Sequence, residues 1–154
     1  MKIFDLRIWT LSLVALALSG CFTNASIREV KSSGAPKAIG PYSQALAYDN
    51  LVFCSGQIAI NPESGQMVTG GIQAETDQIF KNIKAVLNKE GLTLKDVIKT
   101  TVFLKNLDDF SLMNSTYEKA FDGHKPARST VEVSNLPKGA LAEIECIAVR
   151  PGGR

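Results

Sequence analysis

The chain has 154 residues, with 17 Lys and Arg residues against 15 Asp and Glu residues, so its formal net charge is only +2. Its length suits a single domain, and its balanced charge lacks the basic field that nucleic-acid binding usually requires. Three Cys and one His are too few for a disulfide scaffold or a His-rich metal site, so we expect neither a nucleic-acid partner nor a bound metal ion.

The N-terminus has the pattern of a targeting segment. Lys2 and Arg7 precede an apolar stretch from Ile8 to Leu18, which is too short to span a bilayer because a spanning helix needs about 20 residues. The end of this segment, Leu18-Ser19-Gly20-Cys21, resembles a bacterial lipobox, in which the Cys becomes the lipidated first residue of the mature chain. The alternatives are an ordinary signal peptide cut elsewhere, or a wrongly assigned start codon.

The lipobox interpretation divides the chain into three parts. We expect a removed signal peptide at residues 1–20, a tether at 21–33 that carries a lipid on Cys21, and a folded domain at 34–151. The protein would then lie in the bacterial cell envelope, anchored to a membrane and facing the periplasm, with the outer membrane as the expected location. If the segment is not a signal, the protein is cytoplasmic.

The first half of the domain combines a hairpin with a helix. Ser43–Tyr48 and Leu51–Gln57 are short β-like runs separated by Asp49-Asn50, which predicts a hairpin. Apolar residues then recur with helical spacing from Ile72 to Leu87, and Gly91 follows as a helix stop. A further short strand is possible near residues 28–32.

The second half alternates strands with one more helix. Its predicted elements are a capped turn at Thr93–Asp96, a strand at Val97–Leu104, a helix at Leu107–Phe121 capped by Asn106, and strands at Arg128–Ser134 and Leu141–Val149. We expect the helix to bury the stripe Leu107, Phe110, Met113, Tyr117 and Phe121. The order of elements predicts an α+β fold in which both helices pack on one face of a mixed β-sheet.

Two cysteines remain in the predicted domain. Cys54 and Cys146 both lie in apolar, strand-like runs. A disulfide is chemically possible outside the cytoplasm, but buried free thiols are the expected state, because unpaired Cys is among the most buried residue types.

Charged residues interrupt the last two predicted strands. Period-two alternation in Leu141–Val149 places Glu143 and Glu145 on an otherwise apolar face. Arg128 opens the preceding strand, so Arg128 and Glu143 would lie close together if the two strands pair. One interpretation is a surface ion pair worth well under about 1 kcal/mol. The other is a site in which the guanidinium grips a substrate carboxylate and the glutamate orients water.

Other candidate residues carry weaker signals. Tyr42 ends a turn, and Ser55-Gly56 ends a strand with a residue that allows close backbone approach to a ligand. Asn114 is a polar residue beside the apolar stripe of the second helix, where it could face a pocket. His124 lies in a polar loop, and we expect it to be solvated.

Several runs of residues occur in a fixed order from about Val30 to Val149. They are Ala38–Ala45, Leu51–Ile58, Asn82–Leu87, Lys99–Leu104, Pro126–Val131, Leu136–Ala140 and Glu143–Glu145. Together they resemble the RidA/YjgF family of reactive-intermediate deaminases. The resemblance implies a chorismate-mutase-like fold assembled as a homotrimer, with three sites in the clefts between subunits.

The resemblance also implies an activity. Members hydrolyse small 2-imino and enamine acids, such as 2-iminobutanoate and 2-iminopropanoate or its enamine 2-aminoacrylate, to 2-oxo acids and ammonia, without a cofactor. A ligand-binding or holdase-like module that uses the same cleft without turnover is an alternative, and an endoribonuclease is a further one.

Individual residues match positions of the family. Arg128 matches its carboxylate-binding arginine, Glu143 its water-positioning glutamate, and Glu145 a second acidic position. The residues that match its pocket lining are Tyr42, Ser55, Gly56 and Asn114. Thr130 stands where some members carry a Cys.

Overall fold

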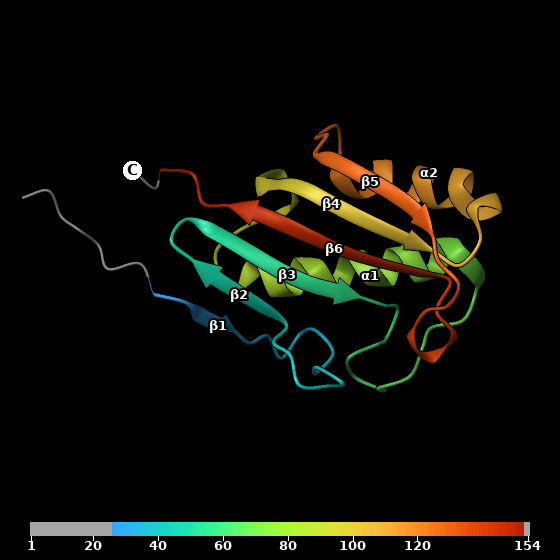
Figure 1. The fold of residues 1–154 in the computed structure, drawn as a ribbon, viewed down its shortest axis with the longest axis horizontal. Coiled ribbons are helices and arrows are strands. Elements are labelled where there is room, and N and C mark those ends of the chain that lie inside the picture. The colour runs from blue at the N-terminus through green and yellow to red at the C-terminus, as the bar shows by residue number, and fades with distance from the viewer. Residues whose placement is uncertain (1–25, 153–154) are drawn as a thin grey trace, which may run out of the picture.

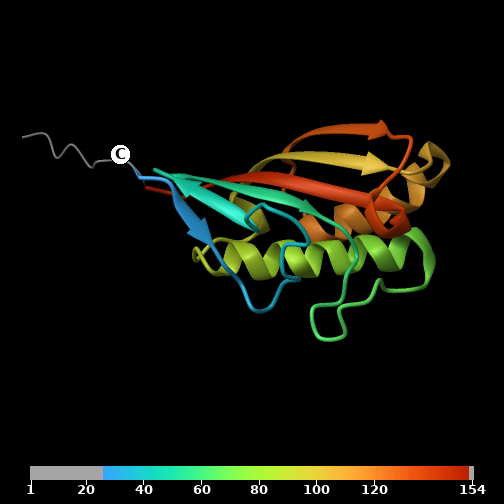
Figure 2. The same ribbon diagram turned by 60° about the horizontal axis from the view of Figure 1, so that its bottom comes forward.

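The computed structural model describes residues 26–152, so the predicted signal peptide, Cys21 and the first residues of the tether lie outside the described residues. The domain is a six-stranded mixed sheet with two α-helices on one face, as Figures 1 and 2 show, and this confirms the predicted fold class. The strands are β1 (Arg28–Val30), β2 (Ala45–Tyr48), β3 (Leu51–Gln57), β4 (Val97–Leu104), β5 (Ala127–Glu132) and β6 (Ala142–Val149). The helices are α1 (Gly71–Asn88) and α2 (Phe110–Phe121). Within residues 26–152, neither helix is long and apolar enough to cross a membrane.

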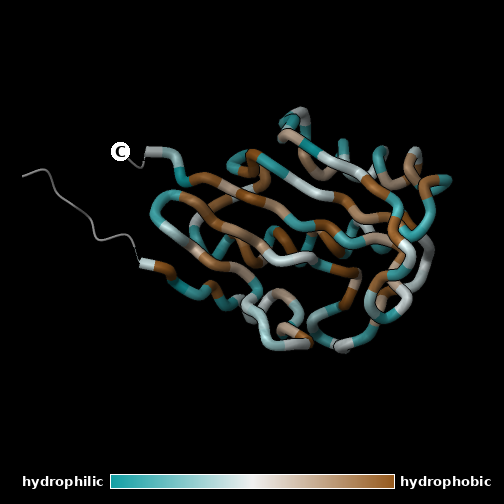
Figure 3. The backbone as a smooth tube through the Cα atoms, in the orientation of Figure 1, coloured by the Kyte–Doolittle hydropathy of each residue, from teal (hydrophilic) through white to brown (hydrophobic). Residues whose placement is uncertain are grey.

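The core lies between the sheet and α1. Every second residue of β6, from Ala142 to Ala148, is almost completely buried against the helices. The predicted stripe of α1 is buried as well, from Ile72 to Leu87. Figure 3 shows the hydrophobic segments concentrated in the central strands β3, β6 and β4. The helical periodicity thus identified the buried face of α1 correctly, whereas the buried face of β6 is the one opposite Glu143 and Glu145.

The second helix differs from its prediction at its start. Residues Leu107–Asp109 form a 3₁₀ turn that Asn106 caps, because its side-chain oxygen accepts a hydrogen bond from the Asp108 amide at 2.9 Å. The α-helix begins only at Phe110. Leu107 and Phe110 are exposed rather than buried, so the buried stripe of α2 is shorter than predicted. The predicted turn at Thr93–Asp96 is confirmed as a 3₁₀ turn with a capping box.

The strands that carry Arg128 and Glu143 do not pair, so the condition under which these two residues would lie close together is not met. The strand order is β1-β2-β3-β6-β4-β5, so β6 lies between β3 and β4 and pairs antiparallel with both. Strand β5 pairs only with β4, and in parallel. The reason is that α2 forms the crossover connection that a parallel pair requires, which places β5 at the edge of the sheet.

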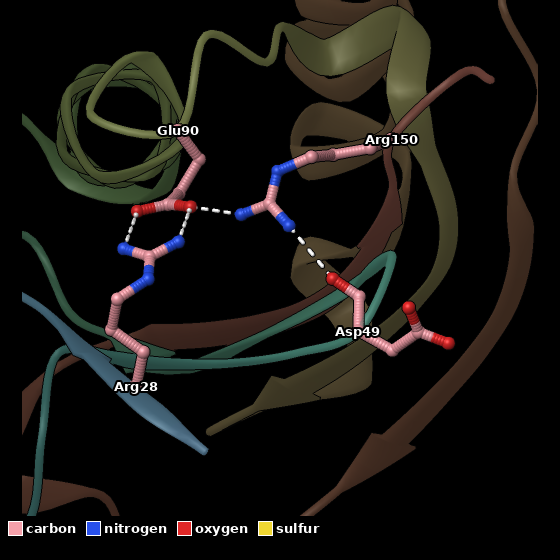
Figure 4. Close-up of polar contacts among 4 residues, drawn as sticks. All are labelled: Arg28, Asp49, Glu90 and Arg150. Carbon is pink, nitrogen blue, oxygen red and sulfur yellow. Dashed lines mark hydrogen bonds and ion pairs between the residues drawn. The ribbon is translucent and has the colours of Figure 1, made fainter. Parts of the chain in front are cut away.

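The folded domain begins earlier than residue 34. Strand β1 pairs with β2, and Val30 is buried. Arg28 donates two hydrogen bonds to the Glu90 carboxylate, at 2.8 and 2.6 Å, and Arg150 pairs with the same carboxylate from the end of β6 (Figure 4). The Arg28 hydrogen bonds in particular hold the pKa of Glu90 below its usual value. The predicted tether therefore ends before Arg28, because residues 28–33 belong to the packed domain.

The two cysteines face each other in the core. Cys54 on β3 and Cys146 on β6 are directly opposite, and both are buried free thiols, as predicted. A hydrogen bond with Cys54, together with burial, raises the pKa of Cys146 well above its ordinary value. The thiolate is therefore disfavoured, which is consistent with a role in packing.

The face of the sheet opposite the helices is uncovered in one chain, as Figure 2 shows. It presents large apolar side chains that are between 41% and 47% exposed, namely Leu46, Tyr48, Phe53 and Val131. Large apolar side chains exposed on an uncovered sheet face are typical of an interaction site. We call it the helix-free face.

Candidate functional site

Arg128 projects from the edge strand β5 towards α2. One of its terminal nitrogens donates a 2.8 Å hydrogen bond to the side-chain oxygen of Asn114. The guanidinium carbon lies 4.5 Å from the centre of the Tyr117 ring, a distance at which a cation and an aromatic face attract each other. Together with the Phe110 ring, whose centre lies 5.6 Å from the guanidinium carbon, these contacts from α2 fix the guanidinium while they leave most of its N–H groups directed elsewhere.

Tyr117 was predicted as a core residue only, and its contact with Arg128 was missed. The phenol oxygen hydrogen-bonds to Thr100 at 2.8 Å, and the ring packs edge-on against Phe80 at 5.4 Å between centroids. The Tyr117 ring is therefore held in a fixed position against the guanidinium. The helical spacing could have predicted this contact, because Asn114 and Tyr117 are three residues apart and therefore share a face of the helix.

An open hollow of about 430 Å³ surrounds Arg128. It is lined by Asn114, Tyr117, Glu118, Gly123, His124, Lys125, Pro126 and Arg128. His124 is not simply solvated, because a ring nitrogen lies 2.6 Å from the Val97 carbonyl oxygen and ties the loop to the start of β4. The hollow is large enough for a small carboxylic acid, and the positively charged guanidinium of Arg128 lines it.

Glu143 lies elsewhere, over Gly56. A Cβ atom at Gly56 would come within 2.8 Å of the Glu143 carboxyl carbon and 3.0 Å of its Cγ, distances that real side chains do not adopt. Gly56 falls where the pairing of β3 with β6 shifts register, between Cys54 and Gln57. Only a residue without a side chain fits beneath the carboxylate here, so Gly56 and Glu143 form one structural unit.

The environment of Glu143 changes its acidity. Burial raises the pKa of Glu143 above the ordinary value of a glutamate, and the neighbouring Glu145 carboxylate adds to this effect. A carboxylate with a raised pKa is a stronger proton acceptor than an ordinary glutamate.

Ser55 and Tyr42 lie beside Gly56. The Ser55 hydroxyl donates a 2.7 Å hydrogen bond to the Ser43 carbonyl, which ties β3 to the segment that carries Tyr42. Tyr42 is 47% exposed, and it lines the same small hollow as Gly56. Tyr42, Ser55, Gly56 and Glu143 therefore form a second cluster.

The structure separates the two clusters within one chain. Arg128 is in register with Thr100, whose hydroxyl bonds α2, so Arg128 lies on the helix side of the sheet. Glu143 is in register with Phe103, three residues further along β4, and three residues reverse the face of a strand. Arg128 and Glu143 thus lie on opposite faces and two strands apart, although each predicted pocket residue lies with one or the other. We call these clusters the arginine cluster (Asn114, Tyr117 and Arg128) and the glutamate cluster (Tyr42, Ser55, Gly56 and Glu143).

No three or more His, Cys, Asp or Glu side chains lie close enough to hold a metal ion in the part of the chain between residues 26 and 152.

Known proteins are similar to this chain in sequence and in fold. The family model described as Endoribonuclease L-PSP matches residues 32–150. The chain belongs to this family, the RidA/YjgF family. A RutC family protein of Pyrococcus abyssi is 52% identical over 116 residues, which are 75% of this chain and 91% of that protein.

Other members of the RidA/YjgF family have more specific names. The Escherichia coli protein named 2-iminobutanoate/2-iminopropanoate deaminase is 45% identical over 126 residues, which cover 80% of this chain and 98% of that protein. The structure of Escherichia coli TdcF with bound serine superposes with a TM-score of 0.77 at 40% identity and covers 80% of this chain and 98% of that chain.

Proposed function

We propose that this protein is a hydrolytic deaminase that converts small 2-imino acids, such as 2-iminobutanoate and 2-iminopropanoate, to 2-oxo acids and ammonia. The observation that carries the proposal is the combination of a fixed arginine in an open hollow with a half-buried glutamate whose pKa is raised. The name of the Escherichia coli relative, and the serine bound to TdcF, support a small amino-acid-like ligand with a carboxylate.

Arg128 would bind the substrate carboxylate. The planar guanidinium offers paired N–H donors that match a carboxylate, and its contact with Tyr117 holds this plane in a defined orientation. Asn114 occupies one donor and leaves others for the ligand. The substrate is therefore oriented by one end, with its imino carbon directed away from Arg128.

Glu143 would activate water. The water oxygen bonds to the imino carbon, the electron pair of the C=N double bond moves to nitrogen, and a water proton passes to the Glu143 carboxylate. With the iminium form of the substrate, Glu143 then returns the proton to nitrogen and takes up the hydroxyl proton as the C–N bond breaks, so ammonia leaves the 2-oxo acid and Glu143 releases the second proton to the solvent. Because an iminium carbon is already electrophilic, positioning and proton transfer suffice, and we propose no cofactor.

The proposed assembly is a homotrimer with sites between subunits. Arg128 and Glu143 lie on opposite faces of one chain, so one chain does not present both to the same substrate. The helix-free face offers the apolar surface for self-association through Leu46, Tyr48, Phe53 and Val131. In such a trimer, the arginine cluster of one copy would face the glutamate cluster of the next.

A coupled assay tests the activity. 2-Iminobutanoate is generated in situ by an amino-acid oxidase or dehydratase, and release of the 2-oxo acid is followed with and without the protein. The wild-type protein should accelerate release, and Arg128→Ala should remove the acceleration. Equal rates with both proteins would contradict the deaminase and favour a binding module without turnover.

An endoribonuclease is the second candidate, because that activity appears in the description of the matching family model. The net charge of +2 weighs against it, since RNA binding depends on a concentrated basic surface. RNA cleavage that survives repurification and disappears in Arg128→Ala would support this candidate instead of the deaminase.

We also propose a lipid anchor on Cys21 that holds the domain at the cell envelope, with the outer membrane as the expected site. The support is the lipobox-like sequence alone, since these residues lie outside those that the structure describes. Globomycin should block processing, labelled palmitate should be incorporated, and Cys21→Ala should release the protein from the membrane fraction. Unchanged fractionation of Cys21→Ala would contradict the anchor.

A further inference from the structure

Helix α1 carries a row of buried polar side chains that the reaction does not use directly. Glu75, Gln78 and Asn82 are spaced so that they share one face of the helix, and each is buried, Asn82 completely. Buried polar groups lower stability unless they are hydrogen-bonded, so their partners show what they hold. We call these three residues the polar row.

Asn82 holds the chain just after β3. Its amide nitrogen donates hydrogen bonds to the carbonyl oxygens of Ile58 and Ile60, at 3.2 and 2.9 Å. Gln78 donates a 2.8 Å hydrogen bond to the Asn82 side-chain oxygen, which fixes the direction of the Asn82 amide. Ile58 is two residues from Gly56, so these bonds fix the strand end that carries Gly56.

Glu75 holds the chain just before Glu143. Its carboxylate accepts a 2.8 Å hydrogen bond from the Leu141 amide, and the Ala142 amide bonds the same carboxylate. Ala142 is the first residue of β6 and the immediate neighbour of Glu143. One helix therefore fixes both backbone segments that meet at the Gly56–Glu143 contact.

The contact needs such support because regular pairing is interrupted there. The β3–β6 ladder is in register through the Cys54–Cys146 pair and resumes at Gln57 opposite Ile144, so Gly56 lies inside the irregularity. Ladder hydrogen bonds alone do not fix the position of a bulged residue. We propose that Glu75 and Asn82 are positioning residues that hold the Glu143 carboxylate over Gly56 in the place where it activates water. This inference rests on the proposed deaminase function.

The first test compares variants that keep size but change hydrogen bonding. Asn82→Asp removes both N–H donors at nearly constant volume, and Glu75→Leu removes the acceptor. Both should lower kcat about tenfold or more while KM stays close to that of the wild type, because neither Glu75 nor Asn82 hydrogen-bonds to a residue of the arginine cluster. Glu75→Gln keeps an acceptor oxygen and should recover most of kcat. A wild-type kcat in folded Asn82→Asp and Glu75→Leu would overturn the inference.

Thr76→Val is the matched control. Thr76 is also completely buried on α1, but its hydroxyl donates only to the Ile72 carbonyl of the same helix, at 2.7 Å. Thr76→Val should lose stability without losing kcat. An equal loss of kcat in Thr76→Val would mean that any buried polar change in α1 disturbs the site, and it would contradict a specific positioning role.

A second measurement does not need turnover. ¹³C NMR of the glutamate carboxyl carbons reports the pKa of Glu143, which depends on the burial of its carboxylate over Gly56. This pKa should fall towards the ordinary value in Asn82→Asp and stay raised in Thr76→Val. If Asn82→Asp does not fold, Gln78→Leu, which removes only the bond that orients Asn82, should show the same change to a smaller extent. An inactive wild-type protein would contradict the deaminase, whereas an unchanged Glu143 pKa would contradict the positioning role.

Discussion

The arginine cluster and the glutamate cluster are built in different ways. Arg128 is oriented by three side chains of a single neighbouring helix, Phe110, Asn114 and Tyr117, and it lines an open hollow. Glu143 is half-buried over a glycine, and its backbone is fixed by contacts from another strand and from α1. The comparison indicates that the binding group depends on local contacts, whereas the proton-transfer group depends on contacts between distant segments.

The largest expected effect is at the arginine cluster. Arg128→Ala should lower kcat/KM about a thousandfold, roughly 4 kcal/mol, because it removes a bidentate, charge-assisted contact with the substrate. The change should appear mainly in KM. Arg128→Lys keeps the charge without the planar pair of donors and should recover only part of the loss. Full recovery in Arg128→Lys would show that charge alone binds the substrate.

The glutamate cluster should respond in kcat instead. Glu143→Gln keeps the size of the side chain but removes the proton acceptor, so kcat should fall about a hundredfold with little change in KM. Steady-state kinetics on 2-iminobutanoate measure both constants. A rise in KM without a fall in kcat would mean that Glu143 binds the substrate, and it would contradict the proposed division of roles between the two clusters.

A smaller effect is expected at Gly56. Gly56→Ala places a methyl group where the Glu143 side chain lies, so the carboxylate must move. We expect kcat to fall about tenfold, because a displacement of about 1 Å can already cost that much. The double variant Gly56→Ala/Glu143→Gln should be no worse than Glu143→Gln, since both changes remove the same group. Additive losses would contradict the shared unit.

The smallest effect concerns pH. A protonated Glu143 cannot accept a proton from water, so kcat/KM should fall as the pH drops through its raised pKa. Glu145→Gln removes the like charge that helps to raise this pKa, so the acidic limb of the profile should move to lower pH. Arg128→Lys should leave the position of the limb unchanged. An unchanged acidic limb in Glu145→Gln would contradict the effect of Glu145 on the pKa of Glu143.

Much of the fold follows from local patterns in the sequence. The alternation in Leu141–Val149 placed Glu143 and Glu145 together on one face of the strand, which is the face opposite the core in the structure, and helical spacing identified α1. These features depend on neighbours a few residues away, which the sequence displays directly.

Strand pairing could not be predicted in the same way. The link between Arg128–Ser134 and Leu141–Val149 is short, which left pairing of these two strands open, and β6 in fact inserts between β3 and β4. A strand's partner depends on how all strands share one sheet, and no local pattern encodes it. For the same reason, the sequence identified Arg128 and Glu143 as candidates but left open whether they lie together, and it assigned Tyr117 to the core without its contact with Arg128.

Subunit mixing tests most directly whether the site is shared between copies of the chain. Arg128→Ala and Glu143→Gln subunits are unfolded, mixed in equal amounts and refolded together, and deaminase activity is compared with the wild type at a substrate concentration well below the KM of Arg128→Ala, where each variant alone has little activity. If Arg128 of one copy works with Glu143 of the next, roughly a quarter of the sites regain both groups, and about a quarter of the activity should return. Mixed oligomers that form without any return of activity would contradict the shared site.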